Sequence, residues 1–207
     1  MERWVLLRKG ADFEAIGKKY QISPRLACLI RNRDVIGEEA IERYLNGTIS
    51  DLYDGMLMKD ADKAIDILKE KIAEEKKIRV IGDYDIDGVN ATYILLEGLE
   101  RLGAYVDSDI PDRIGDGYGL NRHLIDRAYD AGIDTIITCD NGIAAANEIA
   151  YGKELGMTII VTDHHEIPFD EIDGEKIYRL PPADAVIDPK QKDCVYPFKG
   201  LLSLIHI

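Results

Sequence analysis

The segment Ile78-Arg-Val-Ile-Gly-Asp-Tyr-Asp-Ile-Asp-Gly88 joins a short apolar run to a cluster of carboxylates, and two later segments repeat this design. They are Thr135-Ile-Ile-Thr-Cys-Asp-Asn-Gly142 and Met157-Thr-Ile-Ile-Val-Thr-Asp-His-His165. Short β-branched runs that alternate with helical patterns are typical of buried strands in a parallel sheet. Ligands of such sheets bind beyond the carboxyl ends of the strands, which is where all three polar clusters fall. The sequence therefore predicts a single site at that edge.

Strand and helix patterns alternate from Lys76 onward. The expected strands cover residues 77–82, 104–110, 133–138 and 157–161, and the expected helices cover residues 88–102, 121–131 and 143–155. This order predicts the α/β class with a doubly wound, mainly parallel sheet. The sequence after Pro168 is less regular, because several prolines mark loops around one further expected strand at residues 183–187.

The part of the chain before this alternation has a different pattern. Candidate helices lie near residues 12–20, 24–32, 37–46 and 60–75, so we expect a small helical N-terminal segment over residues 1–75. The α/β domain would then occupy residues 76–200. Residues 201–207 would form a tail of different character.

The composition limits the classes of function. The formal net charge is −13, and the acidic excess lies after residue 50. Such a charge argues against nucleic-acid binding through a broad basic face, although bound divalent ions would invert the local potential and attract phosphate. The sequence has no apolar run long enough for a membrane span and no signal-peptide core, so we expect a cytoplasmic protein without a membrane partner. Three widely spaced cysteines predict reduced thiols rather than disulfides or a zinc site.

The carboxylates Asp83, Asp85 and Asp87 match the first half of an EF-hand calcium loop. Ile94 occupies the twelfth position, where an EF-hand has a glutamate, and a strand precedes the loop where an EF-hand has a helix. The nucleophile loop of haloacid dehalogenase-type phosphatases is a second alternative, since it also follows an apolar strand. That loop has the pattern Asp-x-Asp-x-Thr, and this sequence has Asp87-Gly88 at the corresponding place, which counts against it. Three carboxylates at alternate positions repel one another unless a cation joins them, so a metal site is favoured over a solvated turn. Asp87 by itself could be a helix N-cap.

Two other clusters supply further candidate residues. Asp140 lies in an Asp-Asn-Gly turn, a sequence that is common in ordinary turns. Its position directly after an expected strand favours a functional role. One of the two histidines, His164 and His165, could bind a metal ion while the other contacts the substrate. Asp163 could fix the tautomer of a ligand histidine. Arg113, close to the glycine-rich Gly117-Tyr-Gly119 turn, could bring a guanidinium to phosphate oxygens.

Taken in order, these clusters, together with Pro111-Asp-Arg-Ile-Gly-Asp-Gly-Tyr-Gly-Leu120 and Tyr196-Pro-Phe-Lys-Gly200, resemble the DHH phosphoesterase family. The resemblance extends to the members that degrade single-stranded DNA. It implies that two Mn²⁺ or Mg²⁺ ions are held by four ligands: Asp83, Asp85, Asp140 and His164. It also implies that His165 and Arg113 contact the phosphate and that Asp163 supports the histidines.

By this resemblance we expect metal-dependent phosphodiester hydrolysis, in the form of a 5′-to-3′ single-stranded-DNA exonuclease. Another DHH activity on oligonucleotides, cyclic dinucleotides or pyrophosphate is an alternative, as is an inactive DHH-type module that binds single strands or proteins of DNA repair or replication. The family pattern includes a further ligand aspartate and a closing domain downstream of Asp163-His-His165. Since the sequence after Gly200 departs from that pattern, we expect an incomplete domain with weak or no activity.

Overall fold

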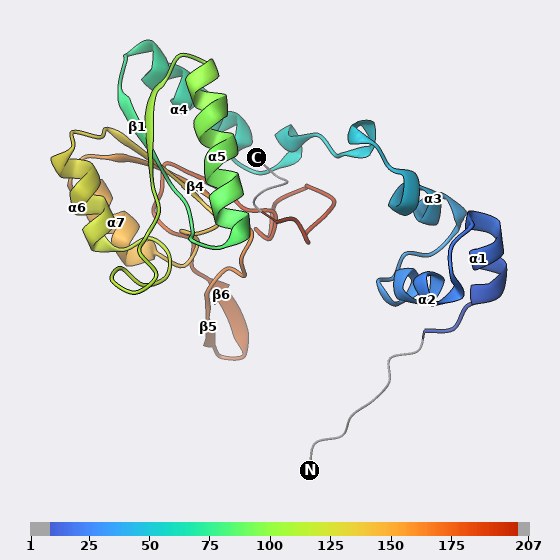
Figure 1. Ribbon diagram of the computed structural model, residues 1–207. Coiled ribbons are helices and arrows are strands. Elements are labelled where there is room, and N and C mark those ends of the chain that lie inside the picture. Colours follow the sequence, from blue (N-terminus) through green and yellow to red (C-terminus); the bar gives the residue numbers. More distant parts are fainter. Residues whose placement is uncertain (1–8, 203–207) are drawn as a thin grey trace. The chain divides into compact units, whose positions relative to one another are not determined.

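The computed structural model describes residues 9–202 of the chain (Figure 1). The chain divides into two compact units, Met1–Leu52 and Tyr53–Ile207. The expected tail falls almost wholly on residues 203–207, which lie outside the described residues. No helix among residues 9–202 is long and apolar enough to cross a membrane.

The first unit is helical, as the sequence predicts. It contains helices α1 (Phe13–Tyr20), α2 (Pro24–Asn32) and α3 (Glu38–Asn46), followed by the short 3₁₀ helix η1 (Ile49–Asp51). The first two helices begin at side-chain caps, because Asp12 accepts from the amide of Ala15 and Ser23 accepts from the amide of Leu26.

The second unit begins with the 3₁₀ helix η2 (Gly55–Leu57) and helix α4 (Ala61–Ala73). The residue pattern predicted α4 as part of the N-terminal segment, whereas in the structure this helix packs on the sheet. Ala64 is buried there, and the Asp60 carboxylate accepts a hydrogen bond from the Val186 amide at 3.1 Å. The packing of α4 therefore places the start of the α/β unit near Tyr53, while the domain boundary at residue 75 stays a prediction.

The sheet has five parallel strands in the order β2-β1-β3-β4-β7. The strands are β1 (Lys77–Ile81), β2 (Tyr105–Asp109), β3 (Thr135–Cys139), β4 (Thr158–Thr162) and β7 (Ala185–Ile187). In this doubly wound order the direction of winding reverses between β1 and β3. The carboxyl ends of β1 and β3 thus flank the crevice where such sheets bind ligands.

Helices cover both faces of the sheet and bury a separate core on each. Helices α4 and α5 (Ile86–Arg101) cover one face, and helices α6 (Arg122–Asp130) and α7 (Ala146–Glu154) cover the other (Figure 1). Successive strand residues point to opposite faces, so Ile136 and Ile159 join the α6/α7 core while Ile137 and Ile160 join the α4/α5 core. Burial on both faces explains why these strands read as continuous apolar runs.

A two-stranded antiparallel hairpin, which the residue pattern did not predict, interrupts the region after Pro168. It consists of β5 (Phe169–Ile172) and β6 (Glu175–Tyr178) and projects from the sheet (Figure 1). Its two-residue turn has φ values of 54° at Asp173 and 81° at Gly174. Positive φ at both positions is the type I′ turn that Asp-Gly favours, so the dipeptide was the available sequence signal.

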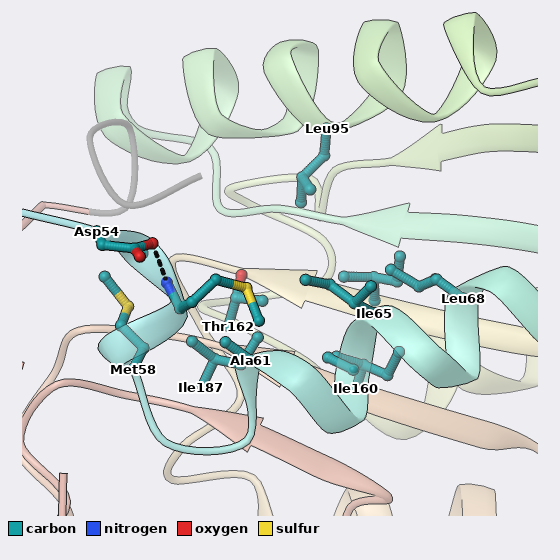
Figure 2. A pocket seen from close by; sticks show the side chains of 13 residues that line it. Asp54, Met58, Ala61, Ile65, Leu68, Leu95, Ile160, Thr162 and Ile187 are labelled. Atoms are coloured by element: carbon teal, nitrogen blue, oxygen red, sulfur yellow. Dashed lines mark hydrogen bonds between the residues drawn. The ribbon is translucent and has the colours of Figure 1, made fainter. Parts of the chain in front are cut away.

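A pocket of about 340 Å³ lies between α4, α5 and the sheet (Figure 2). Leu68 from α4, Leu95 from α5 and Ile160 from β4 point into it. This lining is apolar and offers almost no group that could orient a charged substrate. The polar chemistry is instead gathered at the carboxyl edge of the sheet.

Candidate metal centre

The turn after β1 places Asp83 and Asp85 at the start of α5. Asp85 is the N-cap of this helix, because its Oδ1 accepts from the amides of Asp87 at 2.8 Å and Gly88 at 3.0 Å. The amide of Gly88, more than that of Asp87, lowers the pKa of Asp85. A Cβ at Gly88 would lie 2.6 Å from the carbonyl oxygen of Asp83. Only glycine therefore lets the helix approach the strand end this closely.

Asp83 is buried beside that cap. Its carboxylate oxygen Oδ1 is buried and has no hydrogen-bond partner among residues 9–202. Burial raises the pKa of Asp83. A buried carboxylate oxygen without a partner is costly unless a cation satisfies it, so this atom fits a metal ligand.

The turn after β3 supplies Asp140. This residue adopts a left-handed backbone with φ 61°, and its side chain is buried. The amide nitrogen Nδ2 of the next residue, Asn141, donates to the carbonyls of Ile81 and Cys139, which ties the ends of β1 and β3 together. Burial, followed by the charges of Asp87 and Asp85, raises the pKa of Asp140 to about 7. Burial and the neighbouring carboxylates therefore oppose a full negative charge on Asp140.

Asp163 fixes the two histidines after β4. Its Oδ1 accepts from the amides of His164 and His165 and from Nδ1 of His165 at 2.7 Å, and its Oδ2 accepts from the Ile143 amide at 3.0 Å. Burial acts to raise the pKa of Asp163, but these hydrogen bonds outweigh it, and the pKa is lowered. The bond to Asp163 raises the pKa of His165, whereas burial lowers the pKa of His164.

The side chains from the three turns converge at one place. Ligand atoms of Asp83, Asp85 and Asp140 lie within 4.8 Å of one another, and so do ligand atoms of Asp140, His164 and His165. Asp140 belongs to both groups, so the site offers two overlapping sets of ligands. Carboxylate oxygens with an imidazole nitrogen suit Mn²⁺, and carboxylates alone suit Mg²⁺.

His164 connects both carboxylate turns. Its Nε2 lies 2.8 Å from Oδ1 of Asp140 and 3.4 Å from Oδ2 of Asp87. Asp87 is buried and faces the cluster, and the N-cap of α5 is Asp85, so the interpretation of Asp87 as a cap was wrong.

Arg113 lies close to the cluster without entering it. Its guanidinium carbon is 5.2 Å from the centroid of the Tyr84 ring, and Tyr84 stands between Asp83 and Asp85 in the chain. The same loop carries Tyr118, whose hydroxyl oxygen is 3.3 Å from Nε2 of His165. A cavity of about 460 Å³ opens beside Tyr118 and His165, with Gly119, Asn141 and Asp163 in its lining.

The model of the DHH family N-terminal domain matches residues 77–200, the segment that contains all of these turns. The chain belongs to the DHH family. Among curated DHH relatives, the single-stranded-DNA-specific exonuclease RecJ of Bacillus subtilis (strain 168) is 39% identical over 200 residues, which is 96% of this chain and 24% of the relative. RecJ of Escherichia coli (strain K12) is 32% identical over 202 residues, or 97% of this chain and 33% of the relative. The chain spans about a quarter to a third of the length of these relatives.

Solved structures agree with this assignment to the DHH family. A crystal structure of exonuclease RecJ bound to manganese covers 75% of this chain, with a TM-score of 0.60 and 31% identity, and the match covers 38% of that chain. RecJ from Thermus thermophilus in complex with Mn²⁺ covers 99% of this chain, with a TM-score of 0.65 and 25% identity, and the match covers 27% of that chain. The α/β fold with its mainly parallel sheet is the fold of the RecJ DHH domain.

Two residues at the site were missed as candidates. Tyr118 appeared in the sequence only as part of a glycine-rich turn. Asp188 follows β7 at the same sheet edge, and its side chain is fully buried. Its Oδ1 accepts from the Lys190 amide, but its Oδ2 has no hydrogen-bond partner within the described part of the chain, and burial raises its pKa to about 7. The sequence did offer a signal for Asp188, because this aspartate directly follows the further expected strand at residues 183–187, as the other polar clusters follow their strands.

Proposed function

We propose that this chain is the DHH domain of a metal-dependent, RecJ-like exonuclease that hydrolyses single-stranded DNA from the 5′ end. The observation that carries the proposal is the convergence of Asp83, Asp85, Asp140 and His164 where the winding of the sheet reverses. The two curated relatives are single-stranded-DNA-specific exonucleases, and two neighbouring structures hold manganese.

In this proposal Asp83, Asp85, Asp140 and His164 are the metal ligands. The buried, unpartnered Oδ1 of Asp83 fits that role, since a cation would supply the missing partner. Asp140 is the carboxylate best placed to be shared by two ions, because it belongs to both ligand groups. Bound divalent ions would lower the pKa of a water nucleophile and neutralise charge on the phosphate oxygens.

His165 and Arg113 are the proposed phosphate contacts. The Asp163 carboxylate accepts a hydrogen bond from Nδ1 of His165, and this bond fixes the ring orientation beside the cluster. Arg113 is exposed beside Tyr84, so its guanidinium can reach a phosphate oxygen at the rim. The cavity beside His165 provides space next to the cluster for a part of the substrate.

Metal binding is tested first, by melting the protein with and without Mn²⁺. At a free Mn²⁺ concentration of about 100 times Kd, the gain in stability should be about 2.7 kcal/mol. Asp83→Asn should lose most of this gain, whereas the exposed Asp66→Asn should retain it. Equal Mn²⁺ stabilisation of the two variants would contradict the proposed ligand set.

Hydrolysis is tested with a 5′-labelled single strand, a 3′-labelled single strand and a labelled duplex. We expect weak, Mn²⁺-dependent release of mononucleotides from the 5′ end of the single strand. Asp85→Ala should reduce this rate to background, while Asp66→Ala should not change it. Release from the 3′ end, or hydrolysis of pyrophosphate or a cyclic dinucleotide with the single strand left intact, would replace the proposal by another activity of the family.

A further inference from the structure

Tyr118 contacts His165 from a loop that contributes none of the proposed metal ligands. Its hydroxyl oxygen lies 3.3 Å from Nε2 of His165, and the two rings are perpendicular, with centroids 6.3 Å apart. The other ring nitrogen of His165, Nδ1, lies 2.7 Å from Oδ1 of Asp163. Both nitrogens of this imidazole therefore have a protein partner.

The position of Tyr118 is itself supported by its surroundings. Its ring packs edge-to-face against Tyr84, with centroids 6.1 Å apart, and Tyr84 is covered by the Arg113 guanidinium. The flanking residues Gly117 and Gly119 have φ values of 82° and 72°, which side chains rarely allow. The backbone on both sides thus adopts a specific shape that directs the tyrosine toward His165.

The remainder of this loop is held by polar contacts. The Asp112 carboxylate accepts from the amides of Ile114 and Gly115, and Asp116 accepts from the amide of Asp112. Arg127 of α6 lies 3.6 Å from Asp116 and forms a two-pronged bond with Asp109 at the end of β2. These contacts connect the loop to the sheet, so the position of Tyr118 follows from the fold.

Packing alone does not account for this arrangement. Tyr118 is 60% exposed, so the burial of its ring contributes little to stability. Tyr105, at the opposite edge of the sheet, is exposed to nearly the same extent, at 61%. The feature that distinguishes Tyr118 is its hydroxyl contact with the histidine.

We infer that Tyr118 is a positioning residue, which fixes the tautomer and the ring orientation of His165. When the Asp163 carboxylate accepts from Nδ1–H, the neutral ring carries its lone pair on Nε2, and the Tyr118 hydroxyl donates to that lone pair. The two bonds together hold Nε2 at the rim of the cluster. The catalytic consequence of this inference rests on the proposed function, but the tautomer itself does not.

The tautomer is measured by nitrogen-15 NMR of the metal-free chain with labelled histidine, and the His165 signals are assigned by their loss in His165→Gln. In the parent, with neutral imidazole, Nδ1 and Nε2 should show the separate shifts of a protonated and an unprotonated nitrogen. Tyr118→Phe should move the two shifts toward each other without changing the melting temperature, and Tyr105→Phe should change neither. A parent that already averages the two tautomers, or a Tyr118→Phe spectrum identical to the parent, would overturn the inference.

Turnover gives a second measurement. With Mn²⁺ and a single strand, Tyr118→Phe should lower kcat by about tenfold, the effect of one lost neutral hydrogen bond, and leave KM nearly unchanged. A raised KM at unchanged kcat would make Tyr118 a substrate contact and would overturn the positioning role. Weak or absent hydrolysis by the parent would bear on the proposed function alone, and the NMR result would still decide the inference.

Discussion

Asp163 and Asp188 are both buried carboxylates at the same sheet edge, yet their environments differ. Asp163 accepts four hydrogen bonds through its two oxygens, whereas one oxygen of Asp188 has no hydrogen-bond partner among the residues described. Burial of a charge is tolerated only where hydrogen bonds or ions compensate it. The same substitution should therefore have opposite effects at these two positions.

Asp163→Asn should lower the free energy of unfolding at neutral pH by about 3 kcal/mol, because an amide nitrogen replaces an acceptor in a buried network. The pKa of Asp163 is lowered in the fold, so its contribution is present above the unfolded pKa and is lost as pH falls through the folded pKa. Urea unfolding of parent and variant at neutral and acid pH measures both effects. Equal stability of the two proteins at neutral pH would show that the network is unimportant for the fold.

Asp188→Asn should raise the stability of the metal-free protein. The pKa of Asp188 is raised to about 7 in the fold, against about 3.9 unfolded, so the stability it contributes is complete below about pH 4 and is lost as pH rises through about 7. Relative to the parent, the variant should gain on the order of 2–4 kcal/mol between those pH values. A difference in unfolding free energy that does not change with pH would contradict the raised pKa.

At the scale of the element, the position of helix α5 depends on the close approach of Gly88 to the turn after β1. Gly88→Ala would place a Cβ 2.7 Å from the Asp83 amide nitrogen, so we expect a loss of about 1–3 kcal/mol and weaker Mn²⁺ binding. Gly98→Ala in the same helix has no atom within 4 Å of the new Cβ and should gain about 0.5–1 kcal/mol. Thermal melts of the two variants with and without Mn²⁺ test these expectations. An unchanged melting temperature of Gly88→Ala would show that the turn can adjust.

The elements with a strong residue pattern were predictable from sequence, and those set by tertiary context were not. Strands β1, β3 and β4 are buried on both faces, so their β-branched runs stand out. The turns after them could be assigned to one edge because parallel strands end together. A strand was also predicted at residues 183–187, but its pairing with β4, which brings Asp188 to that edge, is not specified by any local pattern.

The side-chain contacts within the site follow the same rule. Which aspartate caps α5 depends on where the helix begins, and the sequence predicted a start at residue 88, whereas the helix begins at Ile86. The contact of Tyr118 with His165 joins residues 47 positions apart through a loop without periodicity. The residue types at the site were therefore predictable, while several of their partners were not.

At the scale of the whole molecule, the two compact units predict where the chain can be cut. A chain that starts at Tyr53 should keep the melting temperature and the Mn²⁺ response of the parent, since the sheet, its four helices and the candidate ligands all lie in the second unit. A chain that starts at Lys77 lacks α4 and exposes the core around Ala64 and Ile160, so it should unfold at a lower temperature. Equal stability of the two shortened chains would instead support the boundary near residue 75.

The strand order also determines how this sheet avoids pairing with the sheets of other copies of the protein. An open sheet has two edges whose unpaired backbone groups can template the addition of further strands and lead to aggregation. Here one edge is β2, which carries Asp107 and Asp109, and the other is the three-residue β7. Charge on one edge and brevity on the other are two common protections of edge strands. The isoleucine-rich strands, which would be the most hazardous when exposed, occupy the interior of the sheet, where every neighbouring position is already filled.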